Sequence, residues 1–268
     1  MDLKGHRALV TGASSGIGRH YAEKLASYGA DVVITARRGD RLEQLASRLG
    51  EAYGVEVQII VGDLKQPQAS RAIFEEATAC GQKISILINN AGIGKYGDFL
   101  EYNYQDQAEV LSVNALAPTE LTYLFSKHML LHARKSYIVH VASIGAFQPV
   151  SRFAVYCGSK AYLLYFSEAL SFELNKTNVR VMCLCPGGTY TEFFDHSHQK
   201  IKKGGNRFMM SSEKVVTIAI KAMMKERAVC IPGLLNKAAC FLPRFLPRSW
   251  SAALARLSMD QSVEPFHP

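Results

Sequence analysis

The chain has 268 residues, of which 48% are hydrophobic and 20% are charged. This length and composition allow a sizeable core and exclude a disordered chain. No segment approaches the roughly 20 consecutive apolar residues of a membrane span, and the polar N-terminus lacks the apolar core of a secretory signal. We therefore expect a cytoplasmic protein.

The net charge of +8 is concentrated in the last quarter of the chain, because His196 to Trp250 holds eleven Lys and Arg but only two acids. Three interpretations of the stretch 196–250 stay open: a solvated face, an attraction for an anionic group on a substrate, such as the phosphates of an acyl-CoA, or peripheral contact with an anionic membrane. Prolines at 232, 243 and 247 favour a segment lying on a surface over a span. We expect no nucleic-acid partner, because the basic residues come with no recognisable nucleic-acid module.

Short apolar runs rich in Val and Ile alternate along the chain with segments of helical periodicity. The predicted strands are His6–Thr11, Asp31–Thr35, Val55–Val61, Ile84–Asn89, Tyr137–Ala142, Val179–Cys185 and Ala228–Ile231. The predicted helices are Gly18–Tyr28, Arg38–Leu49, Gln66–Ala79, Gln105–Leu131, Tyr156–Asn175 and Ser212–Lys225. Strands without polar alternation are typical of a parallel sheet buried on both faces.

The alternation predicts an α/β fold, a doubly wound, Rossmann-type sheet of seven parallel strands flanked by helices. There is no internal repeat and no linker, so we expect one domain over residues 1–268. Within it, glycine pairs and paired aromatics predict a long loop at about 187–211, and a basic C-terminal segment covers about 232–268.

A glycine-rich turn, Thr11 to Gly18 with the spacing GxxxGxG, follows the first predicted strand and opens the first predicted helix. Glycines let backbone approach a pyrophosphate, and the start of a helix offers free N–H groups and a favourable dipole. The turn therefore predicts a dinucleotide site. Its candidate contacts are Gly12, Ser14, Ser15, Gly16, Ile17 and Gly18.

Tyr156 and Lys160 are four residues apart in a predicted helix and so share a face. A lysine ammonium near a phenol, whose ordinary pKa is near 10, should lower that pKa and let the tyrosine exchange a proton with a substrate oxygen. Ser143 follows the carboxyl end of a predicted strand, where its hydroxyl can donate to a developing oxyanion. The alternatives are a packed tyrosine, a solvated lysine and a serine that caps a turn.

The position at which NAD enzymes carry an acid, about 20 residues past the glycine turn, is Ala36 here, and Arg37 and Arg38 follow it. An acid would repel a 2′-phosphate, whereas guanidinium groups bind phosphate. We therefore predict a preference for NADP(H). The alternative is that the two arginines begin a solvated basic helix.

Taken together, these motifs resemble the short-chain dehydrogenase/reductase superfamily, in its single-domain branch, from about Leu3 to Gly233. The motifs are Thr11–Gly18, Asp63-Leu64, Asn89–Gly92, Asn114, Ser143, Tyr156–Lys160, and Pro186-Gly187 with Thr189 and Thr191. With the NADP(H) preference predicted from the arginines, the resemblance implies an oxidoreductase that interconverts a carbonyl and a secondary alcohol, and it implies a homodimer or homotetramer. The implied catalytic residues are Asn114, Ser143, Tyr156 and Lys160, with Asn114 holding a water that links Lys160 to solvent.

The resemblance also assigns cofactor contacts beyond the glycine turn. They are Asp63, at the adenine, with Asn90, Ala91, Gly92, Tyr156, Lys160, Pro186, Gly187, Thr189 and Thr191. As alternatives, Asp63 fits a helix N-cap and Asn114 a local backbone hydrogen bond. No CxxC pair or His/Cys cluster at zinc spacing occurs, so we expect no metal.

The expected substrate zones are rich in aromatic residues, namely Tyr96, Phe147, Phe153, Tyr190, Phe193 and Phe194, and they also hold Gln148. They suggest an apolar pocket for a lipophilic, steroid-like or acyl carbonyl, unless many of them belong to the core. A competing hypothesis is a non-catalytic NADP-binding sensor or scaffold on the same fold. A sugar-nucleotide epimerase or dehydratase is disfavoured, because those enzymes carry a GxxGxxG pattern and a longer C-terminal domain, and this sequence shows neither.

Overall fold

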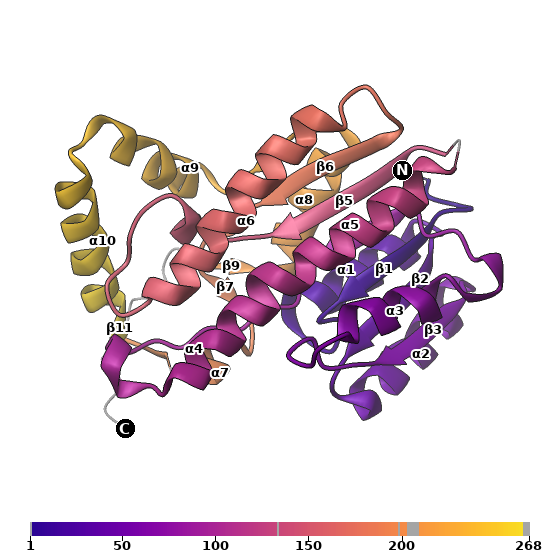
Figure 1. Ribbon diagram of the computed structural model, residues 1–268, viewed down its shortest axis with the longest axis horizontal. Helices are drawn as coiled ribbons and strands as arrows, with labels where there is room; N and C mark the ends of the chain where they lie inside the picture. Colours follow the sequence, from indigo (N-terminus) through magenta and orange to yellow (C-terminus); the bar gives the residue numbers. More distant parts are fainter. Residues whose placement is uncertain (1, 133, 198, 203–208, 265–268) are drawn as a thin grey trace.

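The protein is described by a computed structural model that covers residues 2–132, 134–197, 199–202 and 209–264. Its centre is a seven-stranded parallel sheet with the order β3-β2-β1-β4-β5-β6-β10 (Figure 1). The strands are β1 (Arg7–Thr11), β2 (Asp31–Ala36), β3 (Val57–Val61), β4 (Ile86–Asn89), β5 (Ser136–Val141), β6 (Val179–Leu184) and β10 (Val229–Cys230). The predicted doubly wound parallel sheet is confirmed.

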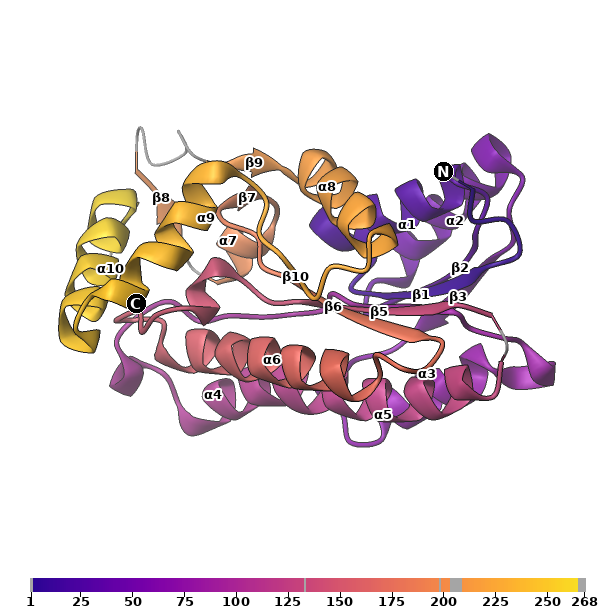
Figure 2. The same cartoon turned by 90° about the horizontal axis from the view of Figure 1, so that it is seen from above.

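Helices cover both faces of the sheet (Figure 2). On one face lie α1 (Gly16–Ser27), α2 (Gly39–Tyr53) and α8 (Ser212–Met224); on the other lie α3 (Ala69–Ala77), α4 (Tyr104–Leu111), α5 (Ala117–Leu130) and α6 (Ala154–Glu173). Alternate side chains of a strand point to opposite faces. Val10 of β1 accordingly packs in the cluster that contains Leu25 of α1, whereas Leu9 packs in the cluster that contains Phe125 of α5. Burial on both sides explains why the strands are apolar without alternation.

The long helix predicted at Gln105–Leu131 is interrupted. Between α4 and α5 the chain forms a π-helical turn, Ser112–Leu116, with the fully buried Asn114 at its middle. A physical reason lies four residues further on: Pro118 has no N–H, so it cannot donate to the carbonyl of Asn114 as an α-helix requires. The sequence pattern predicted a helix here but not this local change of pitch.

The segment predicted as a loop at 187–211 contains β7 (Thr189–Tyr190), α7 (Phe193–His196), β8 (Lys200–Ile201) and β9 (Met210–Ser211), while residues 198 and 203–208 lie outside the described residues. The basic C-terminal segment forms α9 (Leu234–Phe241) and α10 (Arg248–Ser262), here named the C-terminal arm, and then β11 (Val263–Glu264). Because β11 pairs with β8, the end of the arm is tied to the loop. Short 3-10 turns occupy Ala79–Gly81, Phe99–Glu101, Ile144–Ala146 and Leu242–Phe245.

The arm lies at one end of the molecule, beyond the carboxyl ends of the central strands (Figures 1 and 2). Across the described residues, no helix combines the length and the apolar character needed to cross a bilayer.

Candidate active site

A cavity of about 730 Å³ opens where the strand order changes direction beside β1, at the carboxyl ends of the central strands. Ligands of doubly wound sheets bind at this kind of crevice. Nearly every cofactor contact predicted from the sequence lines it: Gly12, Ser14, Ser15, Gly16, Ile17, Arg37, Arg38, Asp63, Asn90, Ala91, Gly92, Tyr156, Lys160, Pro186, Gly187, Thr189 and Thr191. Gly18 does not line the cavity and lies behind the turn.

The glycine turn is a tight cradle at the N-terminus of α1. Gly12 and Gly16 have φ angles of +66° and +53°, which side chains rarely adopt. A Cβ on Gly18 would lie 2.3 Å from the carbonyl oxygen of Gly12. The backbone can therefore reach into the cavity at the start of a helix, as a pyrophosphate requires. On this geometry the turn fits a dinucleotide.

Asn90 braces this turn from the end of β4. Its side-chain amide donates to the carbonyl oxygen of Thr11 at 2.8 Å, and the hydroxyl of Thr11 accepts from the backbone N–H groups of Asn90 and Ala91 at 3.0 and 2.9 Å. Two turns from distant parts of the sequence are thereby fixed to each other. The carboxylate of Asp63 accepts from the backbone N–H of Lys65 at 3.1 Å, a local bond, while it also lines the cavity.

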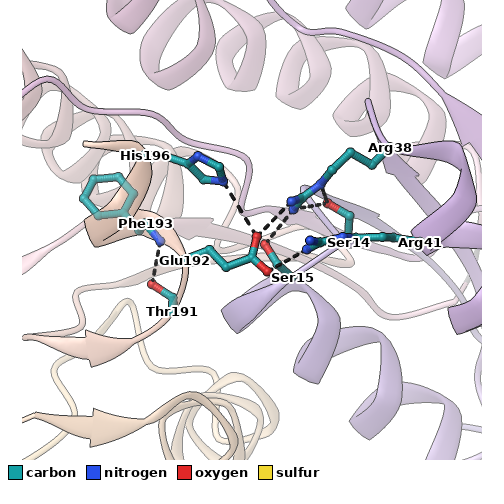
Figure 3. Close-up of polar contacts among 8 residues, drawn as sticks. All are labelled: Ser14, Ser15, Arg38, Arg41, Thr191, Glu192, Phe193 and His196. Atoms are coloured by element: carbon teal, nitrogen blue, oxygen red, sulfur yellow. Dashed lines mark hydrogen bonds and ion pairs between the residues drawn. The ribbon is translucent and has the colours of Figure 1, made fainter. Parts of the chain in front are cut away.

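A cluster of two arginines lies next to the glycine turn (Figure 3). The guanidinium of Arg38 donates to the hydroxyls of Ser14 and Ser15 at 3.0 and 3.2 Å. Arg38 and Arg41 both bind the carboxylate of Glu192, at 2.8 and 2.6 Å. Sequence reasoning missed Arg41 and Glu192. Arg41 could have been found from its spacing, because it lies three residues after Arg38 at the start of a helix. No sequence signal pointed to Glu192.

The predicted catalytic side chains converge from three elements. Ser143 ends the segment after β5, and its hydroxyl is hydrogen-bonded to Tyr156 of α6. Lys160 of the same helix donates to the carbonyl oxygen of Val141 at 2.8 Å, with its Nζ 5.7 Å from the Tyr156 ring centroid. A proton-transfer group, a hydrogen-bond donor and a cation thus share the wall of one cavity.

Asn114 is close to this set but is fully buried and does not line the cavity. Its amide donates to the carbonyl oxygen of Ile93 at 2.8 Å and to the hydroxyl of Ser159 at 3.0 Å, and its carbonyl accepts from the N–H of Ile93 at 2.9 Å. A Cβ on Gly92 would lie 3.3 Å from Asn114 Oδ1 and 3.2 Å from Lys160 Nζ. Asn114 therefore holds the backbone that lies against the lysine.

The expectation that Lys160 lowers the pKa of Tyr156 is wrong for this structure. Burial raises the pKa of Tyr156 above its ordinary value, with the Cys157 thiol adding to the rise and the hydrogen bond to Ser143 opposing it. The lysine is itself buried, and burial lowers its pKa to about 8. Burial is therefore the largest influence on the pKa of each group.

An aromatic wall closes the cavity beside the tyrosine. Phe153 stacks on Tyr156 with ring centroids 4.2 Å apart, and Phe193 of α7 lies 5.3 Å from Tyr156. Of the predicted substrate residues, Gln148, Phe153, Phe193 and Phe194 line the cavity. Tyr96, Phe147 and Tyr190 do not: Tyr96 is buried behind Phe153, Phe147 packs against a separate core cluster, and Tyr190 is half exposed.

Sequence reasoning missed the contribution of the C-terminal arm to this wall. The arm and its flanks supply Leu235, Asn236, Ala239, Ser258, Met259 and Val263. Asn236 also packs on Gly187, one of the predicted cofactor contacts, since a Cβ on Gly187 would lie 2.5 Å from its side-chain amide. Among the described residues there is no group of three or more His, Cys, Asp or Glu suited to a metal ion.

The family model for short chain dehydrogenases matches residues 6–202. The chain belongs to this family. Among its relatives, 3-oxoacyl-(acyl-carrier-protein) reductase FabG of Aquifex aeolicus is 35% identical over 203 residues, which cover 76% of this chain and 82% of the relative. The 17-beta-hydroxysteroid dehydrogenase type 3 of Mus musculus is 30% identical over 221 residues, covering 81% and 71%.

A solved short-chain dehydrogenase from Sphingobium yanoikuyae, in complex with NADPH, superposes with a TM-score of 0.80 at 29% identity, covering 91% of this chain and 97% of that one. The short-chain dehydrogenase described here is thus an oxidoreductase of a family that acts on alcohols and carbonyls with a nicotinamide dinucleotide.

Proposed function

We propose that the protein is an NADP(H)-dependent oxidoreductase that interconverts a carbonyl and a secondary alcohol, with Tyr156 as the proton-transfer residue. One observation carries the proposal. Tyr156, Ser143 and Lys160 line the same cavity as the glycine turn and the arginine pair. A non-catalytic sensor on this fold would have no need of the catalytic side chains, which disfavours that alternative.

When bound, the dinucleotide supplies or takes up the hydride. Tyr156 donates its proton to the substrate oxygen in reduction and takes one back in oxidation. Ser143 donates a hydrogen bond to the same oxygen and so stabilises the charge that develops there. Burial raises the pKa of Tyr156, so its phenol is protonated at neutral pH and carries the proton that reduction requires. Lys160 and Asn114 lie behind it as the positioning and proton-supply groups.

The preference for NADP(H) is supported by Arg38 and Arg41. Both guanidinium groups are near the glycine turn, and together they already bind one anion, the carboxylate of Glu192. Two arginines that hold a carboxylate between them offer donors suited to a phosphate monoester. Arg37, which is exposed but lines the cavity, adds positive charge at its rim.

The proposed substrate is a lipophilic carbonyl compound, steroid-like or acyl. The support is the wall beside Tyr156, which is built from Phe153, Phe193 and Met259, and the names of the two relatives, which act on an oxoacyl chain and on a hydroxysteroid. The described residues form one catalytic domain in this proposal, because the C-terminal arm lines the same cavity as the glycine turn.

The proposed partners are a second copy of the chain and an anionic membrane surface. Large apolar side chains are exposed on α5, on α6 and at the end of the π-helical turn before α5, namely Leu116, Tyr123, Leu130, Tyr162, Tyr165 and Phe172, and would be covered in a dimer or tetramer. We assign the protein to the cytoplasm, because all six cysteines are free thiols, as a reducing compartment requires.

The C-terminal arm is the part proposed to touch the membrane. It exposes Leu234, Phe241, Leu242, Phe245, Trp250, Leu254 and Leu257. No acid occurs between Arg227 and Asp260, whereas four basic residues do: Lys237, Arg244, Arg248 and Arg256. Exposed apolar side chains among cations fit the surface of an anionic bilayer.

The test of the catalytic proposal is NADPH oxidation with a panel of lipophilic carbonyl compounds. We expect Tyr156→Phe to lower the turnover by about 100-fold or more, because general acid catalysis of this kind contributes about 10²–10⁴-fold. The matched control is Tyr53→Phe on the exposed end of α2, which should retain full activity. Full turnover in Tyr156→Phe would refute the assigned mechanism.

A further inference from the structure

Glu192 connects two parts of the cavity that are far apart in the sequence (Figure 3). It precedes α7, in the loop after β6, and its two carboxylate oxygens each bind a different arginine of α2 or its N-cap: Oε2 binds Arg38 at 2.8 Å and Oε1 binds Arg41 at 2.6 Å. His196, one turn further along the loop, lies 3.7 Å from Oε2. The two arginine pairs hold the pKa of Glu192 down at about 2, so the group is an anion at neutral pH.

The neighbours of Glu192 in the chain contact the site of proton transfer. Thr191 lines the cavity and accepts from the N–H of Phe193 at 3.2 Å. The ring of Phe193 lies 5.3 Å from the ring of Tyr156, and a Cβ on Gly94 would approach its tip to 2.9 Å. Glu192, which binds the two arginines, is therefore followed directly by Phe193, which packs beside Tyr156.

We propose that Glu192 competes with the 2′-phosphate of NADP(H) for Arg38 and Arg41, so that a 2′-phosphorylated cofactor, and not NAD(H), releases the turn that carries Phe193. This inference rests on the proposed cofactor preference. Two anions cannot both occupy one pair of guanidinium groups without repulsion. Each anion therefore weakens the binding of the other.

Two consequences follow from this competition. The protein gives up part of its affinity for NADP(H), because the cofactor must first displace an internal anion. In return, the occupancy of the 2′-phosphate site is linked to the position of Phe193 beside Tyr156. By the reciprocity of linkage, any ligand that needs Phe193 to move should bind more tightly once the 2′-phosphate is present.

The test uses two probes that differ only in the 2′-phosphate, namely 2′,5′-ADP and 5′-AMP, titrated calorimetrically into the full chain. We expect Glu192→Gln to raise the affinity for 2′,5′-ADP about fivefold and to leave the affinity for 5′-AMP within twofold, since couplings between sites typically begin at about this size. The matched control is Asp195→Asn, an exposed acid on the helix that follows Glu192, which should change neither affinity.

A second readout follows the loop itself. Hydrogen exchange of the amides in residues 189–197 should speed up when 2′,5′-ADP binds to the wild type, and should already be fast in Glu192→Gln. If the wild type prefers 2′,5′-ADP over 5′-AMP, an unchanged or weaker affinity of Glu192→Gln for 2′,5′-ADP would overturn the competition. If instead the wild type binds both probes equally and Arg38→Ala changes neither affinity, the proposed NADP(H) preference fails.

Discussion

Lys160 is buried, and it keeps its place beside Tyr156 at a cost in stability. Only 4% of the residue is exposed, and burial lowers its pKa to about 8. Each unit of pKa shift corresponds to about 1.4 kcal/mol of differential interaction between the two protonation states. A lysine retained under these conditions is better explained by chemistry at the substrate than by the stability of α6.

We predict that Lys160→Met lowers kcat/KM for carbonyl reduction by about 100-fold while leaving Tm unchanged or higher, because a buried cation is replaced by an apolar chain of similar length. Between about pH 8 and its ordinary pKa of 10.5, Lys160 binds fewer protons in the folded protein than in the unfolded chain. The contribution of this lysine to stability should therefore rise with pH there, so the stability of the wild type relative to Lys160→Met should rise over this range. The control is Lys221→Met on the exposed face of α8. A drop in Tm with retained activity would show a purely structural lysine.

At the scale of elements, two helices differ in the space around a glycine: Gly18 lies at the start of α1, and Gly50 lies within α2. Gly18 leaves no room for a side chain, whereas a Cβ on Gly50 would meet only an ordinary contact at 4.0 Å. We predict that Gly18→Ala destabilises the protein by about 1–3 kcal/mol and weakens dinucleotide binding. Gly50→Ala should stabilise it by up to about 1 kcal/mol. Thermal unfolding of both variants checks this, and equal Tm values would contradict the tight packing of the turn.

For the whole molecule, the C-terminal arm is the proposed membrane contact. We predict co-sedimentation with vesicles that contain anionic lipid at low salt, reduced at high salt and on vesicles of neutral lipid. Replacing Phe245 and Trp250 by Ser should remove most of the binding, while Leu131→Ser, an exposed apolar residue at the end of α5, should leave it intact. If the protein does not bind anionic vesicles at low salt, the proposed membrane contact is refuted.

The sequence pattern predicted most of the sheet and the helices on its faces, because burial on both sides leaves a direct trace in runs such as Val32 to Ile34. Four-residue spacing likewise placed Tyr156 and Lys160 on one helix face. The pattern could not show that burial sets the direction of the pKa shift at both groups, since burial depends on what packs over α6. Nor could it bring Glu192 to Arg38, a pairing across 154 residues made only by the folded loop.

The most direct test of the proposed cofactor preference is the ratio of kcat/KM with NADPH to that with NADH, measured for the reduction of one carbonyl substrate. We predict a ratio of at least about ten in the wild type, since a good phosphate contact supplies more than 1.4 kcal/mol. Arg41→Ala should lose most of this preference, and Arg48→Ala, further along α2, should keep it. An equal or higher kcat/KM with NADH in the wild type would contradict it.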